Sequence, residues 1–197
     1  MNSSKGHKGT KAGGAGTLRV IGGKYRSRRI RVPERPGLRP TPDRVRETLF
    51  NWLGQELDGL ACLDLYAGSG ALGFEAASRG AARVVLVEKD RATAAELERS
   101  RAALDASQVS VVIADAETFL ERERGRFDVV FLDPPFRQNA LPAILGKLAA
   151  RLEPGARVYV ESDSPVDPAP PWTELRRARA GQVSYQLLQW NASEEQP

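Results

Sequence analysis

From residue 60 onward, the chain alternates between short apolar runs and longer segments whose apolar residues recur at helical spacing. Apolar strands separated by amphipathic helices are typical of a parallel sheet covered on both faces, so we predict an α/β domain. Gly80 and Gly155 fall where helices are expected to stop. The predicted strands are residues 61–66, 83–88, 109–114, 127–132 and 157–162, and the predicted helices are residues 71–79, 92–106, 116–124 and 141–152.

Further elements flank this alternating pattern. Residues 173–190 read as two more strands that turn near Gly181–Gln182, which suits an antiparallel pair at the sheet edge. Residues 41–57 form a candidate helix, because their apolar residues share one face at helical spacing. Thr41 is a suitable N-cap and Pro42 suits the first helical position, so we expect this helix to begin there.

Positive charge is concentrated at the N-terminus of the 197-residue chain. Residues 1–39 contain eleven Lys and Arg against one acid, although the whole chain has a net charge of only +4. We expect residues 1–17 to be a disordered basic tail, and residues 18–40 to be a basic hairpin, with strands at 18–23 and 28–32, and its linker. Bases on an ordered element suit a polyanion such as nucleic acid, whereas a merely solubilising tail is the alternative.

The composition restricts the remaining functional classes. No stretch approaches the ~18 apolar residues of a membrane span, and the N-terminus lacks the apolar core of a signal peptide. Cys62 is the only cysteine and His7 the only histidine, which argues against a disulfide, a Cys/His metal site and a histidine base. We therefore expect a cytoplasmic protein without a metal. We also expect a monomer, because no sustained heptad pattern is present.

A glycine-rich loop follows the first predicted strand of the domain. Gly68, Gly70 and Gly73 satisfy G-x-G-x-x-G, and Glu88 ends the next strand twenty residues after Gly68. In nucleoside-binding folds such glycines let the backbone approach the ligand, and such an acid accepts hydrogen bonds from ribose hydroxyls. NAD(P) and S-adenosylmethionine are both compatible ligands, and a simple tight turn is the structural alternative.

Two further acids bear on the choice of ligand. Asp64 lies four residues before Gly68 in an otherwise apolar strand, and a buried carboxylate needs a hydrogen-bond donor or a cationic partner. The ammonium group of S-adenosylmethionine would be such a partner, so Asp64 favours this ligand, although a capping role is also possible. Asp115 closes the third strand, where it can hold an adenine amino group or act as a plain helix N-cap.

The predicted strand 127–132 ends in an unusual tetrapeptide, Asp133, Pro134, Pro135 and Phe136. The carboxyl ends of strands in open α/β folds are where ligands bind. The Asp133 side chain and the Pro134 carbonyl can accept both N–H bonds of an exocyclic amino group, with the backbone held rigid by proline. Phe136 can stack on a base extruded from its helix or loop. A proline turn after a strand is the alternative.

Five segments of the chain together carry a family resemblance. They are LDLYAGSGALGFEAASRG, VVLVEKD and FLDPPF, preceded by RVIGGKYRSRRIRVP and GLRPTPDRVRETLFNWL. Taken together they resemble the bacterial small-subunit ribosomal RNA guanine-N2 methyltransferases, over residues 18 to about 190. The glycine loop and the Asp-Pro-Pro-Phe segment specify only amino-group methylation, whereas the two N-terminal segments point to the rRNA guanine enzymes.

The resemblance implies a Rossmann-like class I S-adenosylmethionine-dependent methyltransferase domain at 41–192, with a seven-stranded, mostly parallel sheet and helices on both faces. It implies S-adenosylmethionine as methyl donor. It implies as target the N2 amino group of one guanine in 16S rRNA, within an assembling or assembled small ribosomal subunit. By matching position, the donor site would comprise Asp64, Gly68 and Gly70 at the methionine part, Glu88 at the ribose, and Asp115 and Ala116 at the adenine. Asp133, Pro134, Pro135 and Phe136 would hold the guanine, and the RNA-contact candidates are Lys24, Arg26, Arg28, Arg29, Arg31, Arg39 and Arg44.

Three other functions remain compatible with the same residues. The first is an amino-methyltransferase that acts on DNA adenine or on protein. The second is an NAD-dependent oxidoreductase that uses the full glycine pattern. The third is an RNA-binding assembly factor whose pocket has no catalytic role.

Overall fold

The computed structural model describes residues 16–32, 41–134 and 141–192. Within these ranges the chain builds a seven-stranded sheet in the order β5-β4-β3-β6-β7-β9-β8. The first five strands run parallel, whereas β9 runs antiparallel to both β7 and β8, which confirms the predicted α/β sheet with an edge hairpin. The strands are β3 (Ala61–Asp64), β4 (Arg83–Glu88), β5 (Val109–Ile113), β6 (Phe127–Leu132), β7 (Leu152–Ser162), β8 (Trp172–Ala180) and β9 (Val183–Trp190).

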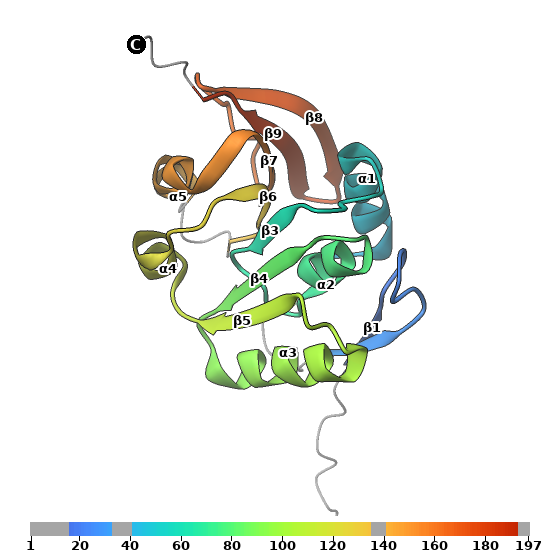
Figure 1. Cartoon of the computed structure of the whole chain (residues 1–197). Helices are drawn as coiled ribbons and strands as arrows, with labels where there is room; N and C mark the ends of the chain where they lie inside the picture. The colour runs from blue at the N-terminus through green and yellow to red at the C-terminus, as the bar shows by residue number, and fades with distance from the viewer. Residues whose placement is uncertain (1–15, 33–40, 135–140, 193–197) are drawn as a thin grey trace, which may run out of the picture.

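Helices cover both faces of this sheet, as Figure 1 shows, and each face has its own apolar core. The core on one face contains side chains of α1, α2 and α3, and the core on the other contains side chains of α4 and α5. No helix in the described ranges combines the length and the apolarity that crossing a membrane requires. The helices are α1 (Asp43–Leu53), α2 (Ala71–Ser78), α3 (Arg91–Leu104), α4 (Ala116–Arg122) and α5 (Leu141–Leu148).

Strand β7 begins earlier than the apolar pattern predicts. Helix α5 ends at Leu148, a short 3-10 turn covers Ala149–Arg151, and the strand starts at Leu152. The predicted helix stop at Gly155 is therefore wrong. This glycine has a positive φ of 78° inside β7, in a stretch where the pairing with β6 is irregular and shifts register.

The start of α1 also differs from the prediction. The N-cap position is Pro42, and no side chain caps the helix. The hydroxyl of Thr41 instead donates to Oε1 of Glu161 at the end of β7, over 3.4 Å. The predicted N-cap role of Thr41 is wrong, because its hydroxyl bonds to a distant carboxylate and accepts no hydrogen bond from the first turn of α1.

The predicted basic segment forms an N-terminal hairpin, and this hairpin packs against α2 and α3 (Figure 1). Its antiparallel strands are β1 (Gly16–Arg19) and β2 (Arg29–Val32). Leu18 and Ile30 face the core, whereas the basic side chains of both strands are exposed. The first strand ends at Arg19 rather than at residue 23. Val20 still bonds to Arg28 and Ser27 of the hairpin loop, but the N–H groups of Ile21 and Gly22 donate to Glu75 of α2.

Candidate functional site

Four acids lie at the carboxyl edge of the sheet, at or just after the ends of neighbouring parallel strands. Asp64 ends β3, Glu88 ends β4, Asp133 follows β6, and Glu161 lies near the end of β7. Asp64 pairs with Leu86 and Phe131, and Tyr159 pairs with Phe131. Because side chains alternate along a strand and paired residues share a face, the four acids lie on the side of the sheet that carries α1 and α2.

The loop between β3 and α2 needs glycine for two different reasons. Gly68 and Gly70 have positive φ angles of 49° and 75°, which glycine adopts without steric cost. Gly73 lies inside α2, where a Cβ atom would overlap a methyl group of Leu86 on β4. The first two glycines therefore shape the turn, and the third allows α2 to pack closely on the sheet.

Asp64 is the most deeply buried of the four acids, with 4% of its surface exposed. Its Oδ2 accepts a hydrogen bond from the backbone N–H of Gly73 over 3.0 Å. Burial raises the pKa of Asp64 from 3.8 to about 7, and the negative charges of Glu88 and Glu161 add to this effect. The predicted donor is thus a backbone amide, and the carboxyl group holds a proton more readily than an ordinary aspartate.

Glu88, at the end of the neighbouring strand β4, forms a hydrogen bond with the backbone of the glycine loop. Its Oε2 accepts from the N–H of Gly68 over 3.0 Å, and its Oε1 accepts from the N–H of Asp90 over 2.8 Å. Asp90 in turn caps α3 by accepting from the N–H of Thr93. The side chain predicted to hold the ribose is therefore fixed between the loop and α3, next to Gly68.

Asp133 and Glu161 form a second pair of acids at the ends of β6 and β7. Burial, followed by the charges of Glu161 and Asp64, raises the pKa of Asp133 well above its usual value. Burial also raises the pKa of Glu161. Pro134 is buried beside this pair, whereas Pro135 and Phe136 lie outside the described residues.

Asp115 has the simpler of its two predicted roles in this structure. It is exposed, and its side chain accepts from the N–H of Glu117 over 3.0 Å, which makes it the N-cap of α4. The neighbouring Ala116 is buried. Contact of this pair with an adenine remains a prediction.

The basic residues predicted to contact RNA are exposed wherever the structure describes them. Arg19 and Arg29 are direct cross-strand partners in the hairpin, and Arg31 lies on the same face. Arg28 donates to the carbonyl of Ala103 at the end of α3 over 2.6 Å. Arg39 lies outside the described residues. The other exposed candidates are Lys24 and Arg26 in the hairpin loop and Arg44 on α1.

Sequence reasoning missed the group that fixes the hairpin to the domain. Glu75 of α2 is fully buried, and its two oxygens accept from the N–H groups of Ile21 and Gly22, both over 2.8 Å. It also pairs with Arg46 of α1 over 3.3 Å and with Arg79 over 2.9 Å. A lone acid inside the otherwise apolar helical segment ALGFEAAS was the available signal.

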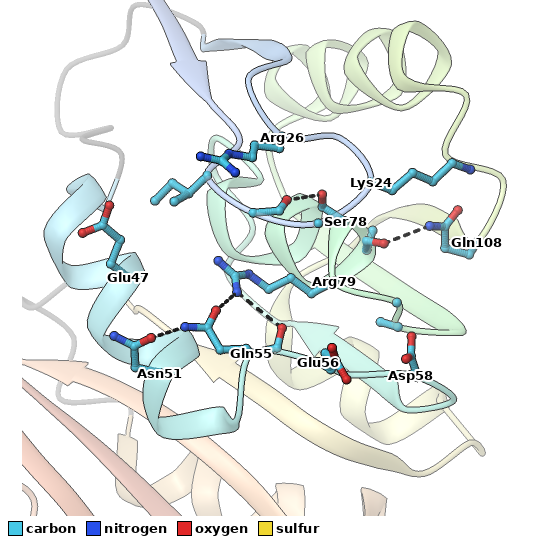
Figure 2. A pocket seen from close by; sticks show the side chains of 16 residues that line it. Lys24, Arg26, Glu47, Asn51, Gln55, Glu56, Asp58, Ser78, Arg79 and Gln108 are labelled. Atoms are coloured by element: carbon cyan, nitrogen blue, oxygen red, sulfur yellow. Dashed lines mark hydrogen bonds between the residues drawn. The ribbon is translucent and has the colours of Figure 1, made fainter.

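A cavity of about 850 Å³ lies between the hairpin loop, α1 and the end of α2. Figure 2 shows Lys24 and Arg26 on one wall, Asn51 and Gln55 on the other, and Arg79 between them. The cavity opens beside the last turn of α2, whereas the glycine loop precedes the first turn. It is therefore separate from the acids at the carboxyl edge.

Comparisons with known proteins agree with this geometry. The family model described as Conserved hypothetical protein 95 matches residues 18–189. The chain is 46% identical over 188 residues to "Ribosomal RNA small subunit methyltransferase D" of Escherichia coli strain K12, covering 92% of this chain and 94% of that one. It is 42% identical over 182 residues to the protein of the same name from Haemophilus influenzae, covering 88% and 94%.

Solved structures give the same result. A putative methyltransferase from Escherichia coli superimposes with a TM-score of 0.83 at 44% identity, covering 90% of this chain and 100% of that one. The sheet order, the glycine loop and the acids at the carboxyl edge are thus those of a Rossmann-like class I methyltransferase fold. The chain belongs to the Conserved hypothetical protein 95 family of methyltransferases.

Proposed function

We propose that this protein uses S-adenosylmethionine to methylate the exocyclic N2 amino group of one guanine in 16S rRNA. The relatives named small-subunit rRNA methyltransferases support the reaction and the class of substrate. The structural observation that carries the proposal is the group of acids beside the glycine loop. The resemblance to the rRNA guanine-N2 enzymes supports guanine N2 as the acceptor and the small subunit as the context. The composition supports a cytoplasmic location, and the lack of a sustained heptad pattern supports a monomer.

The residues present fit a positively charged donor. Asp64 is buried, with a backbone amide as its hydrogen-bond donor, and the groups that shift its pKa upward include two further acids. A cationic ligand would relieve this accumulation of negative charge. S-adenosylmethionine carries both a sulfonium and an ammonium group, and when bound it supplies an electrophilic methyl group.

The same charges argue against the nicotinamide dinucleotide alternative. A pyrophosphate binds where backbone N–H groups are free and the surroundings are neutral or basic. Here the N–H of Gly68 donates to Glu88 and the N–H of Gly73 donates to Asp64. An anionic ligand would meet occupied donors and two carboxyl groups.

Methyl transfer then follows from the position of Asp133. An exocyclic amino nitrogen is a poor nucleophile because its lone pair is delocalised into the ring. Hydrogen bonds from its N–H groups to the Asp133 carboxylate and the Pro134 carbonyl would direct the lone pair toward the methyl group. The N–CH₃ bond forms as the C–S bond breaks, directly and in line, without a covalent enzyme intermediate.

The hairpin supplies the RNA-binding surface in this proposal. Two arginines placed directly opposite each other on a hairpin destabilise it, and an adjacent phosphate backbone would offset that repulsion. Arg19 and Arg29 are such a pair, and Arg31 continues the same face. The expected ligand is therefore a nucleic acid backbone.

Labelled methyl donor tests the substrate directly. The protein would be incubated with total RNA, DNA and protein from a strain that lacks it, together with an Asp133→Ala control. We expect label in 16S rRNA only, and none with the control. Mass mapping of the labelled rRNA should find one methylguanine that is absent from the deletion strain. Labelled DNA or protein with blank RNA would contradict the proposal.

A further inference from the structure

Two hydroxyl groups hold Glu161 in place at the carboxyl edge of the sheet. It is 7% exposed. The hydroxyl of Tyr159 donates to its Oε1 over 2.9 Å, and the hydroxyl of Thr41 donates to the same oxygen over 3.4 Å. Tyr159 comes from the same strand, and Thr41 comes from the segment that leads into α1. The carboxyl group is therefore fixed in place from two sides, and both contacts stabilise its negative charge.

The register of the sheet puts Glu161 next to Asp133. Leu132 pairs with Val160 between the parallel strands β6 and β7, so the two acids that follow are level with each other. They also share a face of the sheet, because each lies one position beyond a paired residue. Glu161 is the charged group with the largest effect on Asp133.

The other ionisable groups around this pair are acids or phenols. The negative charge of Asp64 on β3 raises the pKa of Asp133, and the negative charge of Glu88 on β4 raises the pKa of Asp64. Tyr185 on β9 faces Tyr159, with ring centroids 6.2 Å apart. Among the described residues, the groups that shift the pKa of Asp133 include no cation. Glu161 therefore adds negative charge to a site that nothing in the described chain neutralises.

We propose that Glu161 is a positioning residue for methyl transfer, which stands beside Asp133 and makes that carboxylate the acceptor of the amino proton. The inference rests on the proposed function, because it assigns the proton of the same reaction. As the N–CH₃ bond forms, the C–S electron pair passes to sulfur and one N–H proton passes to Asp133. Whenever Glu161 is ionised, its negative charge favours that proton on its neighbour. The proton leaves to solvent after the product dissociates.

The pH dependence of Glu161→Gln tests this role. Glutamine keeps the shape of the side chain and an acceptor oxygen for Tyr159 and Thr41, but it removes the charge. Activity requires ionised Asp133, and loss of the neighbouring charge lowers the pKa of that group. The acid limb of kcat, measured from about pH 5 to about pH 9 at saturating donor and RNA, should move down by about one pH unit. The plateau should fall by up to about tenfold, because Asp133 becomes a weaker base.

Matched variants separate charge from structure. Glu161→Asp keeps the charge, so its acid limb should stay at the wild-type position. Glu153→Gln removes an acid from the opposite end of the same strand and should leave the whole profile unchanged. Binding of S-adenosylhomocysteine, followed by calorimetry, shows that each variant is folded. An unmoved acid limb in Glu161→Gln would overturn the proposal, even if the plateau falls.

If Glu161→Gln does not fold, a measurement on the wild-type protein can still test the inference. Carbon NMR of the side-chain carboxyl groups should show Asp133 titrating in two steps, one of them at the pH where Glu161 titrates. A single step that is independent of Glu161 would contradict the inference. If wild-type protein does not label RNA at all, the proposed function fails instead, so the two failures can be told apart.

Discussion

Asp64 illustrates how a single buried acid in a candidate ligand site can oppose folding. Its pKa in the folded protein is about 7, against an ordinary value of 3.8. The folded state therefore binds a proton more tightly than the unfolded state does. The stability associated with this group is fully present below about pH 4 and is lost as the pH rises toward 7.

Replacing Asp64 with Asn should therefore stabilise the ligand-free protein at alkaline pH. Asparagine can still accept from the N–H of Gly73, but it carries no charge. We expect the melting temperature of Asp64→Asn at about pH 8 to exceed that of the wild type by about 5 °C. At about pH 4 the two proteins should melt together.

Although Asp64→Asn should gain stability, it should bind the methyl donor more weakly than the wild type does. S-adenosylmethionine should raise the melting temperature of the wild type, and it should have little effect on Asp64→Asn. A variant that is less stable than the wild type at both pH values would contradict the linkage argument, because it would mean that the charged form of Asp64 supports the fold.

For single residues, the sequence identifies the acids of the candidate site better than it identifies their hydrogen-bond partners. Asp64, Glu88 and Asp133 follow from strand ends and glycine spacing. Glu161 also follows a strand, but no local motif marks it, and Thr41 reads as a helix cap. The hydrogen bond between Thr41 and Glu161 joins positions 120 residues apart, and such a pair becomes visible only when the register of the sheet is known.

Between elements, the buried ion cluster of Glu75, Arg46 and Arg79 holds α2, α1 and the hairpin together. Removing one member of a buried pair leaves an uncompensated charge, which costs about 3–5 kcal/mol. We expect Glu75→Ala to lower the free energy of unfolding in urea by about this amount. Glu117→Ala, which breaks an exposed pair with Lys147, should cost less than about 1 kcal/mol. Equal losses in the two variants would contradict this ranking.

A substitution at Gly23 tests the contact between the hairpin loop and α2. Its φ is +70°, and a Cβ atom there would overlap the carbonyl oxygen of Ser78. Gly23→Ala should therefore displace the loop from α2 and weaken RNA binding, with binding of S-adenosylhomocysteine retained. Gly181→Ala is the matched control, because that glycine also has a positive φ but has open space around it. Similar RNA affinities for both variants would show that steric contact with α2 does not matter.

The lengths of elements follow from the sequence only where apolar runs define them. Strands β4 and β6 match their predicted ranges, because both are buried and bounded by polar residues. Strand β7 extends back through an irregular stretch around Gly155, where the residues are partly exposed and carry no alternation. The hairpin strand β1 is cut short by backbone bonds to Glu75, which no propensity describes.

For the whole molecule, charge is divided between a basic hairpin and an acidic sheet edge. Each phosphate contact to single-stranded RNA contributes about −0.7 to the slope of log affinity against log salt. Arg29→Ala and Arg31→Ala should each reduce the steepness of that slope by about 0.7, measured by filter binding at several salt concentrations. Arg176→Ala removes an exposed arginine from β8 at the far edge of the sheet and should leave the slope unchanged.

The complete burial of Glu75 has a further consequence for how this protein can be cut. All eight residues of α2 are buried, and the backbone of the N-terminal loop forms part of their cover. A shortened chain that starts at Thr41 would uncover one face of the helix that follows the glycine loop, and would leave Glu75 without two amide partners. The hairpin that we propose as the RNA-binding surface is thus also part of the packing around α2, and it cannot be removed without exposing that helix.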